Sequence, residues 1–219
     1  MSELTDAIQK GDSAKVAALL DDDPSLLQSA ENGVTPILLA LYHSQADLAR
    51  LIVDRGAPLS FPEACALGDL DAVKRMLAAD RSVLEVRTAD GFPPFALSVF
   101  FRHPEVARFL VEQGADVNAA SENAMHVAPV HAAATTQEHE TMRLLLEHGA
   151  NPNARQQMDY TPLHSAAGRG DIEMAKLLLA HGAERAPKTT DGMTPADIAR
   201  KHEHAEFAEW IEQQLAALP

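Results

Sequence analysis

The stretch that decides the fold reads Thr161-Pro-Leu-His-Ser-Ala-Ala-Gly-Arg-Gly-Asp171-Ile-Glu-Met-Ala-Lys-Leu-Leu-Leu-Ala-His-Gly182. Its Thr-Pro opening is typical of a helix start, because proline suits the first helical position, where the missing N–H costs no hydrogen bond. The apolar run 177–179 and the closing Gly182 are typical of a second helix that ends in a left-handed residue. The stretch therefore predicts a short helix, a turn and a second helix.

The same pattern recurs at fixed spacings along the chain. The prolines that open the first helices are 33 residues apart at Pro129, Pro162 and Pro195. The glycines Gly149 and Gly182 are also 33 residues apart. In the first half, a spacing of 58 separates Pro36 from Pro94 and Gly56 from Gly114. A period of this length predicts a stacked array in which no repeat buries its apolar face alone.

The threonines before these prolines and the alanines after them have their own physical reasons. We expect Thr35, Thr161 and Thr194 to cap the first helices by accepting hydrogen bonds from early backbone N–H groups. Alanine pairs such as Ala132-Ala133 and Ala166-Ala167 allow neighbouring helices to approach closely. The pattern therefore predicts thin layers filled by alanine and leucine.

Thr-Pro-Leu-His, the Gly-Asp turn, the Leu-Leu-Leu run and Gly-Ala-Asn-Pro-Asn-Ala together resemble the ankyrin repeat. The resemblance covers residues 3–215. It implies an all-α ankyrin-repeat solenoid of stacked helix-turn-helix units with short hairpin-like fingers, in a single domain over residues 1–219. The seven expected repeats are 3–28, 29–60, 61–88, 89–120, 121–155, 156–188 and 189–216. Asp159 stands where the family usually has glycine, so we expect a less regular turn before Tyr160.

The composition restricts the class of protein and of partner. With 46% apolar and 23% charged residues, the chain has the composition of an ordinary soluble globular protein. It shows no apolar run long enough to span a bilayer and no secretory signal, and its single cysteine precludes an internal disulfide framework. We therefore expect a cytoplasmic protein.

The net charge of −14 argues against nucleic-acid binding and against an anionic membrane surface. It would steer a basic partner toward the chain. The alternative is that the acidic surface only keeps the protein soluble.

The histidines and the cysteine do not form a pattern typical of catalysis or metal binding. His131 and His164 are 33 residues apart, and the resemblance implies a structural histidine that hydrogen-bonds backbone between repeats. Equivalent positions in successive repeats form a ladder rather than a metal site. Cys65 lies between alanines, where a small buried residue is expected. The sequence predicts no catalytic residue, no metal and no cofactor, and hence no enzyme.

What remains is the surface of the stack. In ankyrin proteins, the finger tips and the ends of the first helices form a concave groove that commonly binds partners. Aromatic residues and arginine are frequent interface hot spots. Transferring those positions to this chain predicts these partner-binding residues: Tyr42, His43, Phe92, Phe100, Phe101, Met125, Val127, Tyr160, Arg169, Met193 and His202.

Two alternatives remain open for Phe100 and Phe101, which either contact a partner or pack between repeats. Phe95 and Phe109 are assigned to packing. The finger at residues 119–128 is two residues longer than the next one, and Ala128 replaces the usual threonine, so we expect this finger to be looser. At the other end, helical spacing predicts that Phe207, Trp210 and Ile211 seal the last layer.

The sequence therefore favours a non-catalytic protein–protein interaction scaffold, expected to be a monomer, that binds a protein partner through the concave face. One alternative is an enzyme or small-molecule site hidden between the fingers, since fold does not dictate function. Another is a structural module that self-assembles through an end repeat.

Overall fold

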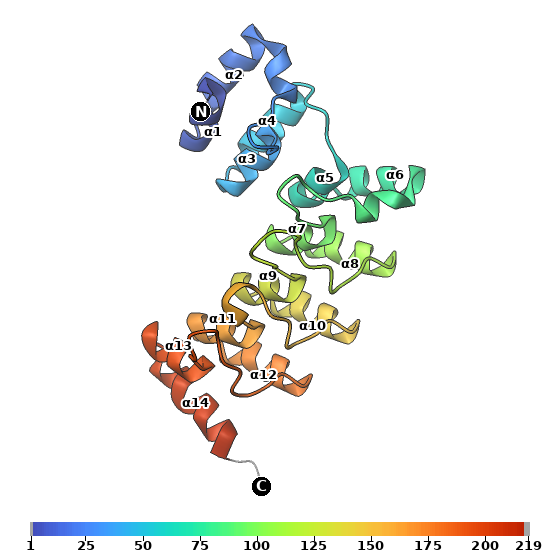
Figure 1. Ribbon diagram of the computed structural model, residues 1–219. Helices are drawn as coiled ribbons and strands as arrows, with labels where there is room; N and C mark the ends of the chain where they lie inside the picture. The colour runs from blue at the N-terminus through green and yellow to red at the C-terminus, as the bar shows by residue number, and fades with distance from the viewer. Residues whose placement is uncertain (1, 217–219) are drawn as a thin grey trace. The chain divides into compact units, whose positions relative to one another are not determined.

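The computed structural model describes residues 2–216, and in that range it is built from fourteen α-helices joined by turns and loops (Figure 1). The all-α prediction is confirmed. The helices form seven successive pairs. The first helices of the pairs are α1 (Glu3–Lys10), α3 (Pro36–Tyr42), α5 (Phe61–Leu67), α7 (Pro94–Phe100), α9 (Pro129–Thr136), α11 (Pro162–Arg169) and α13 (Pro195–Lys201). The second helices are α2 (Ser13–Asp22), α4 (Ala46–Asp54), α6 (Leu70–Ala79), α8 (Pro104–Glu112), α10 (His139–Glu147), α12 (Ile172–Ala180) and α14 (Ala205–Ala216).

Each range predicted as a repeat contains one of these helix pairs. The short 3-10 helices η1 (Pro24–Gln28) and η2 (Arg81–Glu85) follow the first and the third pair. A third, η3 (Gln157–Asp159), forms part of the finger before α11. The chain divides into two compact units, an N-terminal unit of residues 1–106 and a C-terminal unit of residues 107–219. Helix α8 crosses the boundary between them. No helix among residues 2–216 combines the length and apolarity needed to cross a membrane.

In the N-terminal unit, the first helices pack on one another, α1 against α3, α3 against α5 and α5 against α7. The side chains at these contacts are buried, among them Ile8, Ile37 and Leu97. Among the second helices, α2 packs on α4. Burial of such apolar side chains contributes roughly 1.5–3 kcal/mol each, which is the main term that holds the stack together.

In the C-terminal unit, α11 packs between α9 and α13, and α10 packs on α12. The largest buried side chains include Met142, Leu145, Met174 and Leu178. In the last helix, Phe207 and Ile211 are buried, whereas Trp210 is half-buried with its ring 5.8 Å from that of Phe207. The predicted seal at the end of the stack is formed mainly by these two buried residues.

Two of the three predicted threonine caps are confirmed. Thr35 accepts from the N–H of Leu38 at 3.2 Å, and Thr194 accepts from that of Asp197 at 3.3 Å. Thr161 is engaged differently, because its hydroxyl lies 2.9 Å from Nδ1 of His164 and its N–H donates to the same nitrogen at 3.1 Å.

The turns inside the pairs differ in the residue that adopts the left-handed conformation, which is glycine in three pairs and Ser44, Arg102, Gln137 or Glu203 in the other four. Three pairs have a left-handed glycine followed by an aspartate that caps the second helix: Gly11-Asp12, Gly68-Asp69 and Gly170-Asp171. Each of these turns is covered by a glutamine or histidine of the next pair, which also reaches a backbone carbonyl. The contacts are Gln45 with Ile8 at 3.1 Å, His103 with Ala66 at 2.9 Å and His204 with Gly168 at 3.2 Å.

The predicted structural histidines are confirmed. Nδ1 of His131 accepts from the N–H of Ala128 at 3.1 Å, and its Nε2 lies 3.0 Å from the carbonyl of Ala154. His164 repeats this arrangement one repeat later. Burial lowers the pKa of both imidazoles below the usual value, although the hydrogen bonds to carbonyls oppose this change.

Glu63 occupies the equivalent position in the third pair, and sequence reasoning missed its role. Its carboxylate is buried, and it accepts hydrogen bonds from the hydroxyls of Thr35 and Ser60 and from the N–H of Ser60. It therefore links the second and third pairs. The signal was present, since Ser60-Phe61-Pro62-Glu63 aligns with Thr-Pro-Leu-His.

The long finger at residues 119–128 is internally hydrogen-bonded, and the prediction of a looser finger finds no support in its contacts. Ser121 is 1% exposed; its N–H donates to the carbonyl of Val127 and its hydroxyl accepts from the N–H of Val127. The next finger, as expected from Asp159, turns through left-handed conformations at both Met158 and Asp159.

Candidate functional site

Three aromatic side chains form a cluster at the ends of α3 and α7 in the N-terminal unit. This aromatic cluster consists of Tyr42, Phe100 and Phe101. The rings of Tyr42 and Phe101 are stacked with centroids 6.0 Å apart, and Phe100 meets Phe101 edge-on at 5.1 Å. Both geometries are favourable for aromatic pairs.

The members of the cluster differ in burial. Phe101 and Tyr42 are half-buried against the core of the unit, as is Phe92. Phe100, in contrast, is 47% exposed. Phe101 therefore packs against Tyr42, whereas the ring of Phe100 is the exposed one. Phe95 is buried as predicted, whereas Phe109 is only half-buried.

Tyr42 is further fixed by its hydroxyl, which donates to Oδ2 of Asp90 at 2.7 Å. Burial, followed by this hydrogen bond and the charge of Asp90, raises the pKa of Tyr42 well above its usual value. The phenol is therefore neutral at physiological pH. Asp90 lies in the finger before α7, so the bond ties that finger to the end of α3.

A pocket of about 390 Å³ opens beside the aromatic cluster. Its lining contains no aspartate or glutamate: Leu41, Tyr42, Ser44, Ala46, Arg50, Ala66, Leu67, Phe100, Phe101, Arg102 and His103. Burial, aided by the charge of Arg50, lowers the pKa of His103. His43, predicted as a site residue, is exposed next to this pocket but does not line it.

A second pocket of about 390 Å³ lies in the C-terminal unit, between the end of α9, a finger, α11 and the end of α13. We call it the Arg169 pocket. It is lined by Thr135, Gln156, Tyr160, Ser165, Gly168, Arg169 and His202. The structure thus brings together three of the predicted site residues, Tyr160, Arg169 and His202.

Tyr160 is held in the Arg169 pocket from two sides. Its ring lies 5.0 Å from that of His164, and its carbonyl accepts from the N–H of Gln156 at 3.0 Å. Its hydroxyl makes only a long hydrogen bond of 3.4 Å to the carbonyl of His164. Burial raises the pKa of Tyr160, so the phenol is a neutral donor.

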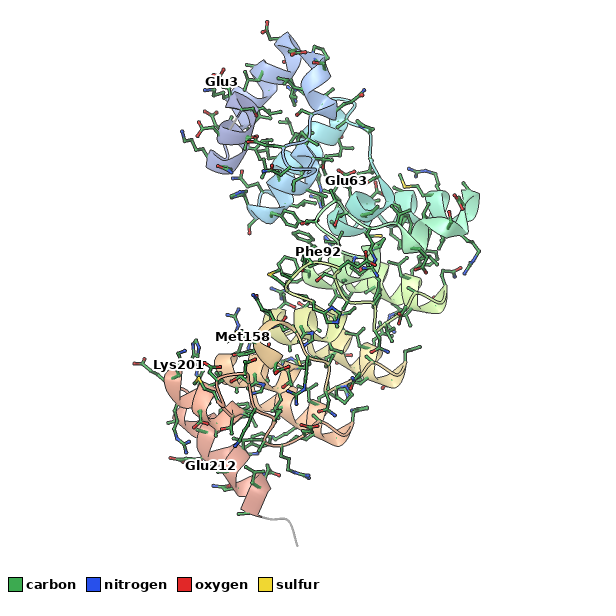
Figure 2. All side chains as sticks on the ribbon, viewed as in Figure 1. Glu3, Glu63, Phe92, Met158, Lys201 and Glu212 are labelled. Carbon is green, nitrogen blue, oxygen red and sulfur yellow. The ribbon has the colours of Figure 1, made fainter. Side chains whose placement is uncertain are left out.

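The remaining predicted site residues of this unit lie on the fingers. Met125 is 45% exposed, whereas Val127 and Met193 are half-buried. Sequence reasoning missed Met158, which is 52% exposed (labelled in Figure 2) and lies 33 residues after Met125. The two neighbouring fingers are joined by a hydrogen bond from the N–H of Gln157 to the carbonyl of Met125.

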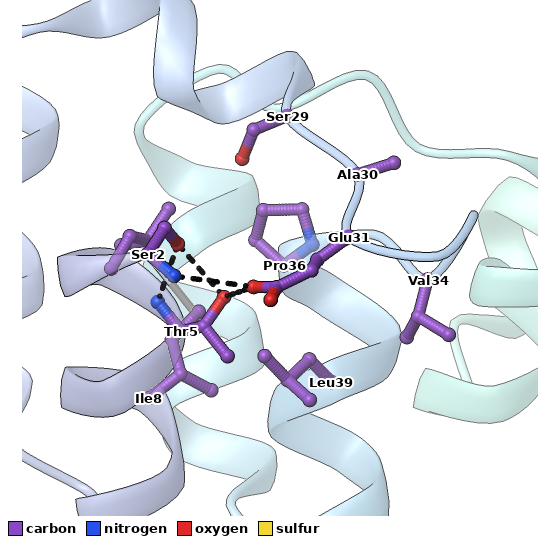
Figure 3. A pocket seen from close by; sticks show the side chains of 10 residues that line it. Ser2, Thr5, Ile8, Ser29, Ala30, Glu31, Val34, Pro36 and Leu39 are labelled. Atoms are coloured by element: carbon purple, nitrogen blue, oxygen red, sulfur yellow. Dashed lines mark hydrogen bonds between the residues drawn. The ribbon is translucent and has the colours of Figure 1, made fainter.

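A smaller pocket of about 190 Å³ lies between α1, α3 and the finger that joins the first two pairs (Figure 3). Its polar groups satisfy one another, because Glu31 accepts from the hydroxyl of Thr5 and from the N–H of Ser2. These hydrogen bonds lower the pKa of Glu31 and keep it ionised. This pocket has fewer polar groups available to a ligand than the Arg169 pocket.

One His–Asp pair resembles the arrangement found in some catalytic sites. Nε2 of His139 lies 2.9 Å from the carboxylate of Asp171. The carboxylate also caps α12 by accepting from Met174 and bonds to Gln137. Burial raises the pKa of Asp171, but the hydrogen bonds from Met174, His139 and Gln137 outweigh it and keep the pKa below its usual value. The pair therefore serves as a link between repeats and a helix cap.

Among residues 2–216 the structure contains no group of three or more His, Cys, Asp or Glu side chains placed to hold a metal ion. Cys65, the single thiol, is buried, and burial raises its pKa to well above the usual range. A thiol in this state is a weak nucleophile.

Comparison with known proteins agrees with this geometry. The family model described as "Ankyrin repeats (3 copies)" matches residues 61–156 and again residues 130–215. The chain is also similar to transient receptor potential cation channel subfamily A member 1 of Drosophila melanogaster, with 28% identity over 131 residues. That match includes 54% of this chain and only 11% of the fly protein.

Proposed function

The chain belongs to the ankyrin-repeat family, and we propose that it is a non-catalytic scaffold that binds a protein partner through the face formed by its first helices and fingers. Ankyrin repeats are in general protein–protein interaction modules. The finer proposal is that residues 1–219 form one repeat domain and that contact is made on the predicted concave face. We further propose that the protein is a cytoplasmic monomer, since its single cysteine suits a reducing compartment.

The observation that carries the proposal is the exposure of Phe100. Contiguous exposed apolar area on a folded protein marks interfaces more often than chance. Phe100 is 47% exposed in the lining of a 390 Å³ pocket, and its ring meets that of Phe101 edge-on at 5.1 Å. Aromatic side chains are frequent hot spots at interfaces.

The test starts from partners isolated from the native cells by pull-down and identified by mass spectrometry. The affinity of each partner for the wild-type chain and for Phe100→Ala is then measured by calorimetry. We expect a loss of at least about tenfold in affinity, with the melting temperature nearly unchanged. Phe101→Ala is unsuitable for this purpose, because it also removes the stack on Tyr42.

Val86→Ala is the matched control, because Val86 is 46% exposed but does not line the pocket. We expect this control to bind as the wild type does. If Phe100→Ala binds every partner as tightly as the wild type does, the aromatic cluster is not part of the interface. The two alternatives from the sequence predict different results: a metabolite-specific rise in melting temperature for a small-molecule site, and a concentration-dependent mass in light scattering for self-assembly.

A further inference from the structure

We propose that the Arg169 pocket binds the carboxylate of an aspartate or glutamate side chain on the protein partner. This inference rests on the proposed function and names the chemistry of one contact.

Five polar side chains of the pocket have no internal partner among the described residues. Within residues 2–216, no hydrogen bond or ion pair engages the side chain of Thr135, Gln156, Ser165, Arg169 or His202. Ser165 is the most buried of the five, at 8% exposed. Five polar side chains without a partner in the described part of the chain thus line one pocket, and their hydrogen-bonding groups are available to a polar ligand.

The charge of the pocket selects an anion. Arg169 and His202 line it, and no aspartate or glutamate does. Three other arginines of the C-terminal unit are paired, Arg143 with Glu140, Arg155 with Glu184 and Arg200 with Glu212. Arg169 has no such partner among the described residues, although the chain carries 32 acidic and only 18 basic residues. A guanidinium fits a carboxylate in a planar, bidentate pair.

The shape of the pocket suits a short acidic side chain approaching over α11. Gly168 contributes no side chain to the pocket lining, and the hydroxyl oxygen of Tyr160 lies 3.6 Å from the place of an ideal Cβ. The same finger that carries Gln156 and Tyr160 presents the exposed Met158 at its turn. We therefore infer that the partner segment places an apolar residue near its acidic one. A basic surface elsewhere on the partner would still be attracted by the net charge of −14.

The test is a peptide-display selection with a random peptide library on the intact chain. On the wild type, we expect selected peptides to carry Asp or Glu at one shared position, enriched at least about tenfold over the library. Arg169→Glu should abolish this enrichment, because it places a like charge opposite the carboxylate. Ser165→Ala should keep the acidic preference and lower the affinity several-fold.

Lys176→Glu is the matched control, since it makes the same charge change on an exposed residue of α12 outside the pocket. It should select the same acidic peptides as the wild type, and circular dichroism melting confirms that each variant is folded. Selected peptides without an acidic preference, or an acidic preference that survives Arg169→Glu, would overturn this inference and leave the scaffold proposal standing. A wild-type chain that enriches no peptide at all would overturn both.

Discussion

The imidazole of His103 occupies the space that a side chain on Gly68 would need. Nδ1 of His103 lies 2.4 Å from the position of an ideal Cβ on Gly68, closer than real Cβ contacts allow. The relationship recurs between Gly170 and His204 and between Gly11 and Gln45. Two constraints therefore favour glycine in these turns. The backbone is left-handed, and a side chain of the next repeat fills the space that a Cβ would need.

Gly68→Ala should lower the free energy of unfolding by more than left-handed strain alone, which costs roughly 1 kcal/mol or more. Gly56→Ala is the control, because Gly56 has a φ of +95° with nothing within 4 Å of its ideal Cβ. Urea denaturation should show the larger loss at Gly68. In a His103→Ala background the excess should disappear, and an unchanged excess would mean that the imidazole is not the obstacle.

Phe100→Ala and Phe101→Ala should differ in their effects on stability although the two residues are adjacent. Phe101 is half-buried and stacked on Tyr42, so its truncation should cost roughly 1–3 kcal/mol in the free energy of unfolding. Phe100 is exposed, and its truncation should cost less than about 0.5 kcal/mol. Chemical denaturation measures both values. Equal losses in the free energy of unfolding would mean that the ring of Phe100 is packed as tightly as that of Phe101.

Glu63→Ala should destabilise the junction between the second and third pairs. It leaves the hydroxyl of Thr35 and the N–H of Ser60 without their acceptor, and each unmet group costs about 1–3 kcal/mol. Glu63→Gln keeps one carbonyl oxygen and should lose less. Melting curves followed by circular dichroism should therefore rank the stabilities as wild type, then Glu63→Gln, then Glu63→Ala. Equal stability of all three would mean that the Glu63 carboxylate does not stabilise the junction.

Stability should fall as the pH is lowered from about 7.5 to 5.5. Burial lowers the folded-state pKa of His103, His131 and His164, so in this range the unfolded chain binds more protons than the folded chain. Each extra proton bound on unfolding contributes about 1.4 kcal/mol per pH unit. The urea midpoint at several pH values measures the effect. His131→Asn should reduce the slope, and a midpoint independent of pH in this range would contradict the assignment.

Gly168→Ala should stabilise the protein by roughly 0.5–1 kcal/mol, because Gly168 is inside α11 and glycine weakens a helix relative to alanine. The added methyl group meets only ordinary contacts, at 3.6 Å from Ile198 and from Tyr160. Differential scanning calorimetry should show a higher melting temperature. Gly170→Ala, two residues further along the chain, should instead lower the melting temperature, because Gly170 has a φ of +66° and faces His204.

Much of the fold could be predicted from local sequence because the determinants are local and repeated. Thr-Pro at helix starts, glycine after the second helices and the spacing of 33 residues act within one repeat or between copies of it. The histidine ladder was predicted in the same way. The contact between the hydroxyl of Thr161 and Nδ1 of His164 was not predicted.

The candidate site could be predicted only as a set of positions. The sequence identified Tyr160, Arg169 and His202, but it did not indicate that Ser165 and Gly168 complete the same pocket. It also could not separate Phe100 from Phe101, because adjacent residues at a helix end have the same local pattern. Met158 was missed although it lies one period after Met125.

The amino-acid sequence by itself therefore determined the repeat, the helix pairs and the face on which partners are expected. Only the tertiary structure decided which side chains on that face are used internally and which are available. The physical reason is that availability depends on contacts between repeats. Phe101 is covered by Tyr42 from two repeats earlier, and Asp171 is engaged by His139, whereas Arg169 meets no carboxylate among the described residues.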